Sequence, residues 1–166
     1  LKVLLIEEPE AHLHPQLQIK LLNYFKDISE RNNIQVIMTT HSPVLSASSK
    51  IDSLIHISCS SGKISAIPLR LCGLQPSSIS FIERWLDITK STLLFAKGVI
   101  LVEGIAEAML IPVLAKRILD EYRQQSDDLS FPSSLEEAGV SIINMNGIYF
   151  RHFMQFFANL PGTPDD

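Results

Sequence analysis

The sequence predicts an α/β fold in two parts. Its first 40 residues alternate an apolar run, a helix-spaced segment and a second apolar run, and residues 98–145 repeat this order. Such alternation is typical of parallel strands covered by helices. Turn residues at 73–78 mark a break between the two parts. With 46% hydrophobic residues, the chain is apolar enough to build a folded core.

The first part is expected to contain two buried parallel strands joined by a helix. Residues 1–6 form a continuous apolar run that ends in two glutamates, and residues 34–40 form a second run that ends at His41. Between them, Pro15 suits a first helical turn, and the asparagine pair at 32–33 suits a helix end. The carboxyl ends of both strands therefore carry polar residues, where ligands bind in open α/β sheets.

A hairpin and a connector are expected next. Residues 54–58 and 63–69 flank a turn and predict a hairpin that finishes or edges the first sheet. Residues 79–96 predict one helix that acts as a connector. The predicted domains are a first part at 1–72, a helical connector at 73–97 and a second part at 98–166.

The second part is expected to begin with a strand, a sharp turn and a helix. Residues 99–102 predict a short buried strand, and Glu103-Gly104 a tight turn. The helix at 106–122 places four apolar residues on one face, namely Leu110, Val113, Leu114 and Ile118. Another strand is predicted at 140–145, and an aromatic-rich helix at 149–160.

Composition excludes several classes of protein. The net charge is -4 and the basic residues form no run, which argues against a dedicated basic DNA-coating module but not against a nuclease. Cys59 and Cys72 are the only cysteines and have no zinc-site spacing, so we expect a reduced, cytoplasmic protein. No signal peptide or membrane-spanning stretch is visible. Because the chain begins without Met inside an apolar run, we expect it to be a piece of a longer protein.

The first candidate site combines Glu7, Glu8 and His41. Adjacent residues at a strand end point to opposite faces, so one glutamate could hold a metal ion while the other orients or deprotonates a water molecule. Phosphoryl transfer from a nucleoside triphosphate needs this division. His41, at the end of the neighbouring strand, could contact a γ-phosphate or the attacking water.

Two plainer interpretations of this region stay open. Glu7, Glu8 and Glu10 could be a solvated strand end, which is what an isolated acidic pair usually is. His12 and His14 have the HxH spacing of a metal site, but a turn next to Pro15 without a third ligand accounts for them better.

The second candidate site combines Glu103 and Glu107 with the glycine between them. Glu103 follows a buried strand, Gly104 lets the backbone turn sharply, and Glu107 lies one helical turn later. A metal-dependent nuclease needs clustered carboxylates of this kind to hold Mg²⁺ ions that activate water. The plainer alternative is a helix N-terminus whose acids are favoured by the helix dipole.

Taken together, these segments resemble the OLD (overcoming lysogenization defect) family of ATP-dependent nucleases. LLIEEPEAHLHP resembles a Walker B segment and D-loop of an ABC-type ATPase, and VIMTTHSP resembles its H-switch. The resemblance implies that Glu7 takes the Mg²⁺-associated position, that Glu8 is the catalytic carboxylate and that residues 11–14 form the D-loop. It also implies that His41 is the switch histidine. Glu7 departs from the general pattern, in which this position is Asp, as do the histidines of the D-loop.

VILVEGIAEAMLIPVLA resembles the opening strand and helix of a TOPRIM nuclease domain. The resemblance implies that Glu103 is metal-associated or a general acid/base and that Glu107 is a second metal-site acid. The Asp-x-Asp pair that TOPRIM domains also need is not recognisable. Asp165 and Asp166 follow a Pro-Gly-Thr-Pro stretch and are expected to lie in a loop.

The resemblance implies ATP and Mg²⁺ as cofactors, with Mn²⁺ as an alternative at the TOPRIM site. It also implies DNA as substrate, a homodimer or higher homo-oligomer, an accessory defence protein as partner, and a role in phage defence or DNA repair. Gly62-Lys63 lacks the rest of a P-loop, and the ABC signature loop would precede Leu1, so we expect the chain alone to be inactive. The alternative functions are a non-nucleolytic ATPase clamp of DNA repair or chromosome maintenance and a purely structural interaction domain.

Overall fold

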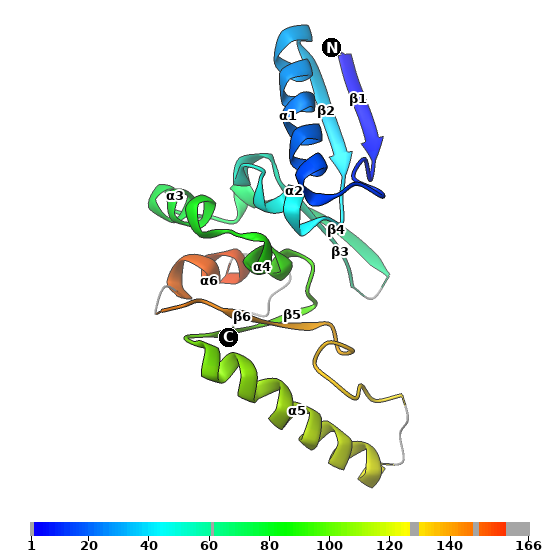
Figure 1. The fold of residues 1–166 in the computed structure, drawn as a ribbon, viewed down its shortest axis with the longest axis vertical. Coiled ribbons are helices and arrows are strands. Elements are labelled where there is room, and N and C mark those ends of the chain that lie inside the picture. Colours follow the sequence, from blue (N-terminus) through cyan, green and yellow to red (C-terminus); the bar gives the residue numbers. More distant parts are fainter. Residues whose placement is uncertain (1, 61, 127–129, 148–149, 159–166) are drawn as a thin grey trace.

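The computed structural model describes residues 2–60, 62–126, 130–147 and 150–158, and it confirms the α/β class. Within these residues the strands form three separate two-stranded sheets. In Figure 1 the β1–β2 sheet and α1 lie at one end of the molecule, α5 lies at the other, and the remaining helices lie between them.

The first sheet is the predicted strand, helix and strand. β1 (Lys2–Glu7) and β2 (Ile34–Thr39) pair in parallel, with Glu7 opposite Thr39 at their carboxyl ends. α1 (Pro15–Asn32) joins them and begins and ends as predicted. The His14 side chain accepts a hydrogen bond from the backbone of Gln16 at the start of α1, and Asn33 adopts a left-handed conformation with φ 48° at its end.

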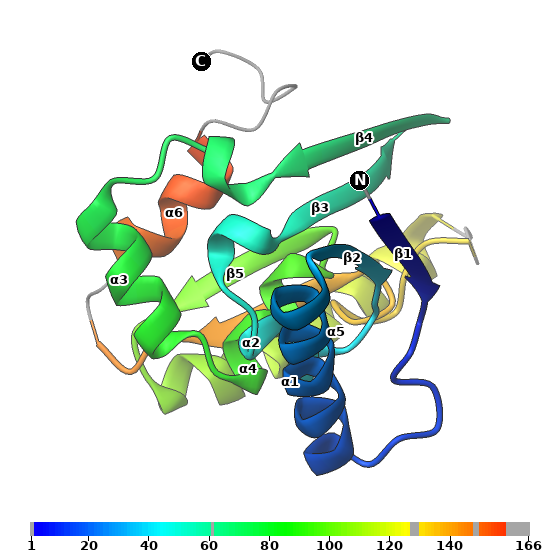
Figure 2. The same cartoon turned by 90° about the horizontal axis from the view of Figure 1, so that it is seen from above.

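The expectation that both strands of this sheet are buried is wrong. Val3, Leu5 and Ile37 are exposed, with Leu5 at 72%. A parallel sheet is buried only when further strands and helices cover both of its faces. Among the residues that the structure describes, this sheet has two strands and one covering helix, so one face is open (Figure 2).

The hairpin is present but belongs to a sheet of its own. β3 (Ile55–Ser60) and β4 (Lys63–Pro68) pair antiparallel, and neither is hydrogen-bonded to the first sheet, which corrects the prediction that they edge it. Gly62 lies in the turn with φ 77°, a conformation that favours glycine. Of the Gly-Lys pair, Gly62 therefore lies in the hairpin turn and Lys63 begins β4.

The connector is several short helices rather than the one predicted. α3 (Pro76–Trp85) has Leu86 as its C-cap residue. α4 (Ile88–Ser91) and the 3-10 helix Thr92–Leu94 follow. The Asp87 side chain accepts a hydrogen bond from the backbone of Lys90 at 2.8 Å and so starts a new helix. Apolar spacing alone does not reveal such an internal cap.

The second parallel pair also matches the prediction. β5 (Gly98–Val102) lies beside β6 (Val140–Asn144), and α5 (Ile105–Ser126) follows β5. α6 (Phe150–Ala158) is the aromatic-rich helix, while Tyr149 and residues 159–160 of its predicted span lie outside the described part of the chain. Short helices at α2 (Pro43–Ala47), Ile51–Ser53 and Leu69–Leu71 were not predicted.

The apolar face predicted for α5 exists but is not buried. Leu110, Val113, Leu114 and Ile118 are all exposed. α5 has 22 residues and projects away from its two-stranded sheet, so most of its length has no neighbouring element (Figure 1). No helix in the described residues is both long and apolar enough to cross a bilayer.

A single hydrophobic core joins the predicted parts. Its buried residues come from the end of the first part, from the connector and from β6 and α6, namely Ile51, Leu69, Cys72, Leu74, Ile82, Leu86, Leu93, Ile143, Met145, Phe153 and Phe156. Three polar contacts accompany this packing. The Ser91 hydroxyl donates to the carbonyl of Pro43 at 2.9 Å, the Ile51 amide donates to Glu83 at 3.1 Å, and Ser78 Oγ lies 3.0 Å from His152 Nδ1. The connector thus lies at the centre of the core.

Candidate functional site

The end of β1 presents the first two glutamates to solvent. Glu7 is the last residue of the strand, and Glu8 leaves it with φ 41°, in the left-handed region. The Glu8 amide donates to the backbone oxygen and to the hydroxyl of Thr39, at 3.1 and 3.2 Å. The carboxyl ends of the two strands are therefore tied together where Glu8 begins the following loop.

His41 lies against Glu8, as expected from two neighbouring strand ends. Its Nε2 is 3.3 Å from Glu8 Oε1, and the two side chains are 84% and 49% exposed. Both the Nε2–H tautomer of the neutral ring and the imidazolium can donate this hydrogen bond. The arrangement places a carboxylate and an imidazole side by side at an open edge of the sheet, where both can reach a ligand.

Glu10 has a different environment from the two glutamates before it. It is 9% exposed, and its Oε1 accepts hydrogen bonds from the Thr40 hydroxyl at 2.5 Å and from the His41 amide at 3.0 Å. Its other carboxylate oxygen is buried without a hydrogen-bond partner in the described part of the chain. The interpretation of Glu10 as part of a solvated strand end is wrong.

The segment at 11–14 is a compact turn. Its first and third amides donate to Glu8 and Glu10 carbonyls at 3.0 and 2.9 Å, and His12 has φ 65°. His14 caps α1, and within the residues that the structure describes no group of three His, Cys, Asp or Glu side chains could hold a metal ion. The HxH sequence therefore lies in a turn that leads into the cap of α1, as the turn interpretation expects.

The second pair of acids lies where β5 turns into α5. Glu103 and Glu107 are exposed, and the Glu103 carbonyl accepts a hydrogen bond from the Gly147 amide at 3.0 Å. A Cβ atom at Gly104 would lie 3.2 Å from Glu107 Oε2, so the Glu107 carboxylate lies over the glycine. Glycine thus leaves room for this carboxylate close to the turn.

The donor chemistry of this turn suits a hard divalent cation. Mg²⁺ is usually bound by one or two carboxylates together with water and substrate phosphates. Glu103 and Glu107 could supply two such carboxylates, but the described residues bring no third acid beside them. Asp165 and Asp166 lie outside the described residues.

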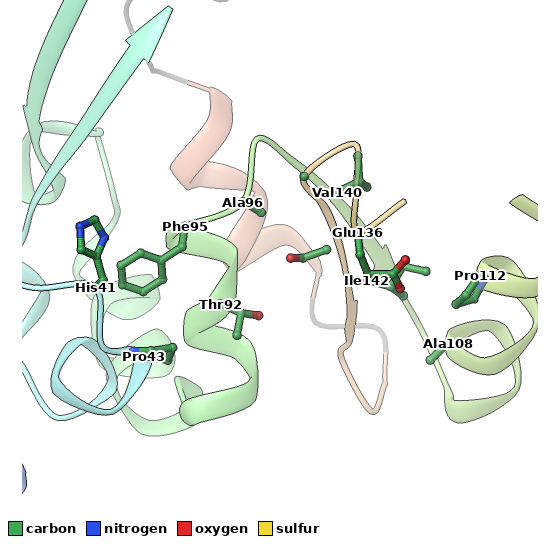
Figure 3. A pocket seen from close by; sticks show the side chains of 12 residues that line it. His41, Pro43, Thr92, Phe95, Ala96, Ala108, Pro112, Glu136, Val140 and Ile142 are labelled. Atoms are coloured by element: carbon green, nitrogen blue, oxygen red, sulfur yellow. The ribbon is translucent and has the colours of Figure 1, made fainter. Parts of the chain in front are cut away.

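A groove of about 660 Å³ separates the two candidate sites. Figure 3 shows His41 and Pro43 along one side of it, Thr92 and Phe95 on the connector, and the start of α5 with β6 on the other side. The lining from α5 includes Ala108, the residue after Glu107. The loop that carries His41 and the helix that carries Glu107 therefore border the same space.

Sequence reasoning missed the roles of Glu10, Thr40 and Ser91 in this architecture. Glu10 and Ser91 are buried and Thr40 is half-buried, and no spacing rule marks a polar residue of this kind.

Comparison with known proteins gives two family matches. Residues 1–45 match the AAA ATPase domain family, and residues 94–162 match the TOPRIM domain of Overcoming lysogenization defect protein-like proteins. The first match contains the Glu8–His41 pair, and the second contains Glu103 and Glu107.

One curated relative is similar over most of the chain. It is Endonuclease GajA of Bacillus cereus (strain VD045), which is 27% identical over 157 residues. The match covers 92% of this chain and 23% of the relative, so the chain spans about a quarter of that protein's length. The two family matches and this relative agree with each other: a segment similar to an ATPase domain is followed by a segment similar to the TOPRIM domain of OLD-like proteins.

Proposed function

We propose that the protein to which this chain belongs is an ATP-dependent DNA endonuclease. The observation that carries the proposal is the pairing of Glu8 with His41 at one strand end, in the same chain as a second strand end with Glu103 and Glu107. One site would hydrolyse the nucleotide and the other would cleave a phosphodiester. The similarity to an endonuclease over 92% of the chain supports this assignment.

In the nucleotide site, Glu8 is proposed as the catalytic carboxylate that orients and deprotonates the attacking water. His41 is proposed to contact the γ-phosphate, because its exposed ring lies beside that carboxylate. Glu7 would hold the Mg²⁺ ion, which supplies positive charge to the phosphates. The similarity of residues 1–45 to an AAA ATPase domain supports these roles.

In the nuclease site, Glu103 and Glu107 are proposed to hold Mg²⁺ or Mn²⁺, which polarises the phosphodiester when bound. Glu103 is also proposed as a general acid/base, and its position directly after β5 supports this role. The chain's net charge of -4 leaves the basic surface for DNA to other segments or to a second subunit. A homodimer or higher assembly, an accessory protein and a role in phage defence or repair belong to the same proposal.

We also propose that the 166-residue chain is inactive alone. It contains no P-loop sequence, and two carboxylates in its described part are fewer than a two-metal site uses. The polypeptide would be incubated with plasmid DNA, Mg²⁺ or Mn²⁺, and ATP. ATP hydrolysis or DNA cleavage by this polypeptide that is lost in Glu8→Gln would contradict the proposal that it is inactive alone.

The full-length protein tests the two activities separately. We expect Glu8→Gln to lower ATP hydrolysis by about 10²-fold or more, since it removes the base, while ATP binding is retained. We expect Glu103→Ala to abolish DNA cleavage and to leave ATP hydrolysis within about threefold of wild type. Glu30→Ala, at an exposed position of α1, is the matched control for loss of an acid.

The rival function is a non-nucleolytic ATPase clamp, and the absence of a third acid beside Glu103 in the described residues favours keeping it as an alternative. A clamp would hydrolyse ATP in a Glu8-dependent way without cutting DNA under any metal condition. Cleavage that is equal in wild type and Glu103→Ala would point to a contaminating nuclease and would remove the support for the endonuclease.

A further inference from the structure

We propose that Glu10 is a positioning residue for ATP hydrolysis. Its buried carboxylate fixes the backbone of Thr40 and His41, and this sets where the His41 ring stands relative to Glu8. The inference rests on the function proposed above and extends it to a residue that touches neither nucleotide nor metal.

The first support is the way in which one carboxylate oxygen holds two successive residues. Glu10 Oε1 accepts from the Thr40 hydroxyl at 2.5 Å and from the His41 amide at 3.0 Å. Both donors lie just beyond the end of β2, in the loop that leads into α2. Hydrogen bonds to an ionised acceptor are the strong class in proteins, so this contact restrains the loop at its tip.

The second support is that the rest of the loop is held as well. The Ser42 amide donates to the Thr40 hydroxyl at 2.9 Å, and the Ser42 hydroxyl donates to Gln18 at 2.6 Å. The Ser42 hydroxyl also accepts from the Leu45 amide at the start of α2, at 3.3 Å. The backbone is therefore anchored on both sides of His41.

The third support is the contrast between this anchored backbone and the His41 side chain. The ring is 84% exposed, and its only recorded side-chain contact in the described structure is with Glu8, at 3.3 Å. Packing does not hold such an exposed ring in place. The position of the ring depends on the position of the His41 backbone, and the hydrogen bond to Glu10 fixes that backbone.

The fourth support is the unpaired oxygen of Glu10. Its Oε2 is buried without a hydrogen-bond partner among the described residues. Leaving a carboxylate oxygen unpaired in the interior is unfavourable, and such exceptions are concentrated where function requires them.

The experiment measures steady-state ATP hydrolysis by the full-length protein with Glu10→Ala, Glu10→Gln and the control Glu30→Ala. We expect Glu10→Ala to lower kcat by about tenfold or more and to change KM by less than about threefold, because the nucleotide is still bound but His41 is misplaced. Glu10→Gln keeps an oxygen acceptor for Thr40 and His41, so its kcat should recover to within about threefold of wild type. A kcat for folded Glu10→Ala within about twofold of wild type overturns the proposal.

If Glu10→Ala does not fold, Thr40→Val takes its place, since it removes one donor to the same oxygen. It should lower kcat without raising KM, and an unchanged kcat would overturn the proposal.

Hydrogen exchange gives a readout that does not depend on hydrolysis. The His41 amide is protected by its bond to Glu10, so peptides covering 40–42 should exchange at least about tenfold faster in Glu10→Ala and not in Glu30→Ala. Unchanged exchange would overturn the proposal directly. If wild type and Glu8→Gln hydrolyse ATP equally, the proposed function fails, while the exchange measurement still decides whether Glu10 positions the loop.

Discussion

At the scale of single residues, the connector contains a buried lysine, Lys90, that pairs with Asp87. Lys90 is 5% exposed, and its Nζ lies 2.7 Å from the Asp87 carboxylate, which is itself 57% exposed. Burial raises the pKa of Asp87, but the hydrogen bonds and charge of Lys90 outweigh it and hold this pKa below its usual range. Asp87 therefore both caps α4 and balances the charge of Lys90.

Two substitutions at Asp87 separate these roles. Asp87→Ala should lower the free energy of unfolding by about 1–3 kcal/mol, because it removes the cap and the counter-charge at a half-exposed site. Asp87→Asn keeps a capping side chain and should lose less. Urea unfolding of the polypeptide at pH 7 measures both, and equal losses would show that the charge alone matters.

The same pair has a pH dependence of known sign. Because the folded pKa of Asp87 is lowered, its contribution to stability is present above the unfolded value of about 4 and is lost as the pH falls through the folded value. The difference in unfolding free energy between wild type and Asp87→Ala should therefore narrow below about pH 4. A difference that widens in acid would contradict the assignment.

Sequence reasoning at this scale succeeded for residues placed by strand ends. Glu8 and His41 were expected to approach each other because each follows one of two neighbouring parallel strands, and they lie 3.3 Å apart. Glu10 was not recognised, since its burial depends on how the loop after β2 folds back onto it. An acid of this kind is indistinguishable in sequence from a solvated one.

At the scale of elements, the end of α1 is fixed by one residue. Asn33 adopts φ 48° and ψ 51°, and its amide donates to the Ser29 carbonyl. Asn33→Gly should change the free energy of unfolding by only a few tenths of a kcal/mol, since both residues tolerate this conformation. Asn33→Ala should cost about 1 kcal/mol, because alanine has a Cβ atom but lacks the polar side chain that lets asparagine adopt this conformation. Thermal unfolding of the two variants measures the difference, and equal melting temperatures would argue against the cap.

Elements with clear start and stop residues were predicted well, and those shaped by tertiary contacts were not. Pro15 and the asparagine pair at 32–33 gave the bounds of α1 correctly. The connector was predicted as one helix because its apolar spacing runs through Asp87, whose capping contact ends that regularity. Burial of β1 and β2 was predicted from their continuous apolar runs, which show what a strand could contact and not whether this stretch of chain supplies the contact.

At the scale of the whole molecule, the core depends on the connector as much as on the two parts it joins. Ile82 is fully buried in α3 and belongs to the same cluster as Ile51 and Phe153. Ile82→Ala should cost about 2–5 kcal/mol, the range for deleting buried methyl groups from a packed core. Urea unfolding followed by near-ultraviolet circular dichroism measures this loss of stability, as a transition at lower urea concentration than in wild type. Val113→Ala, at an exposed position of α5, is the control and should have a small effect.

This shared core determines where the chain can be recombined with its relatives. The TOPRIM match begins at residue 94, yet the side chains of Ile143 and Phe153 pack in one cluster with residues that precede it, such as Leu86 and Leu93. In a chimera joined at residue 94, core residues from two different proteins would have to pack against each other without being matched in shape. Exchange of the whole stretch 51–158 would transfer the interior intact, so the natural unit of exchange begins more than 40 residues before the segment that matches the TOPRIM domain.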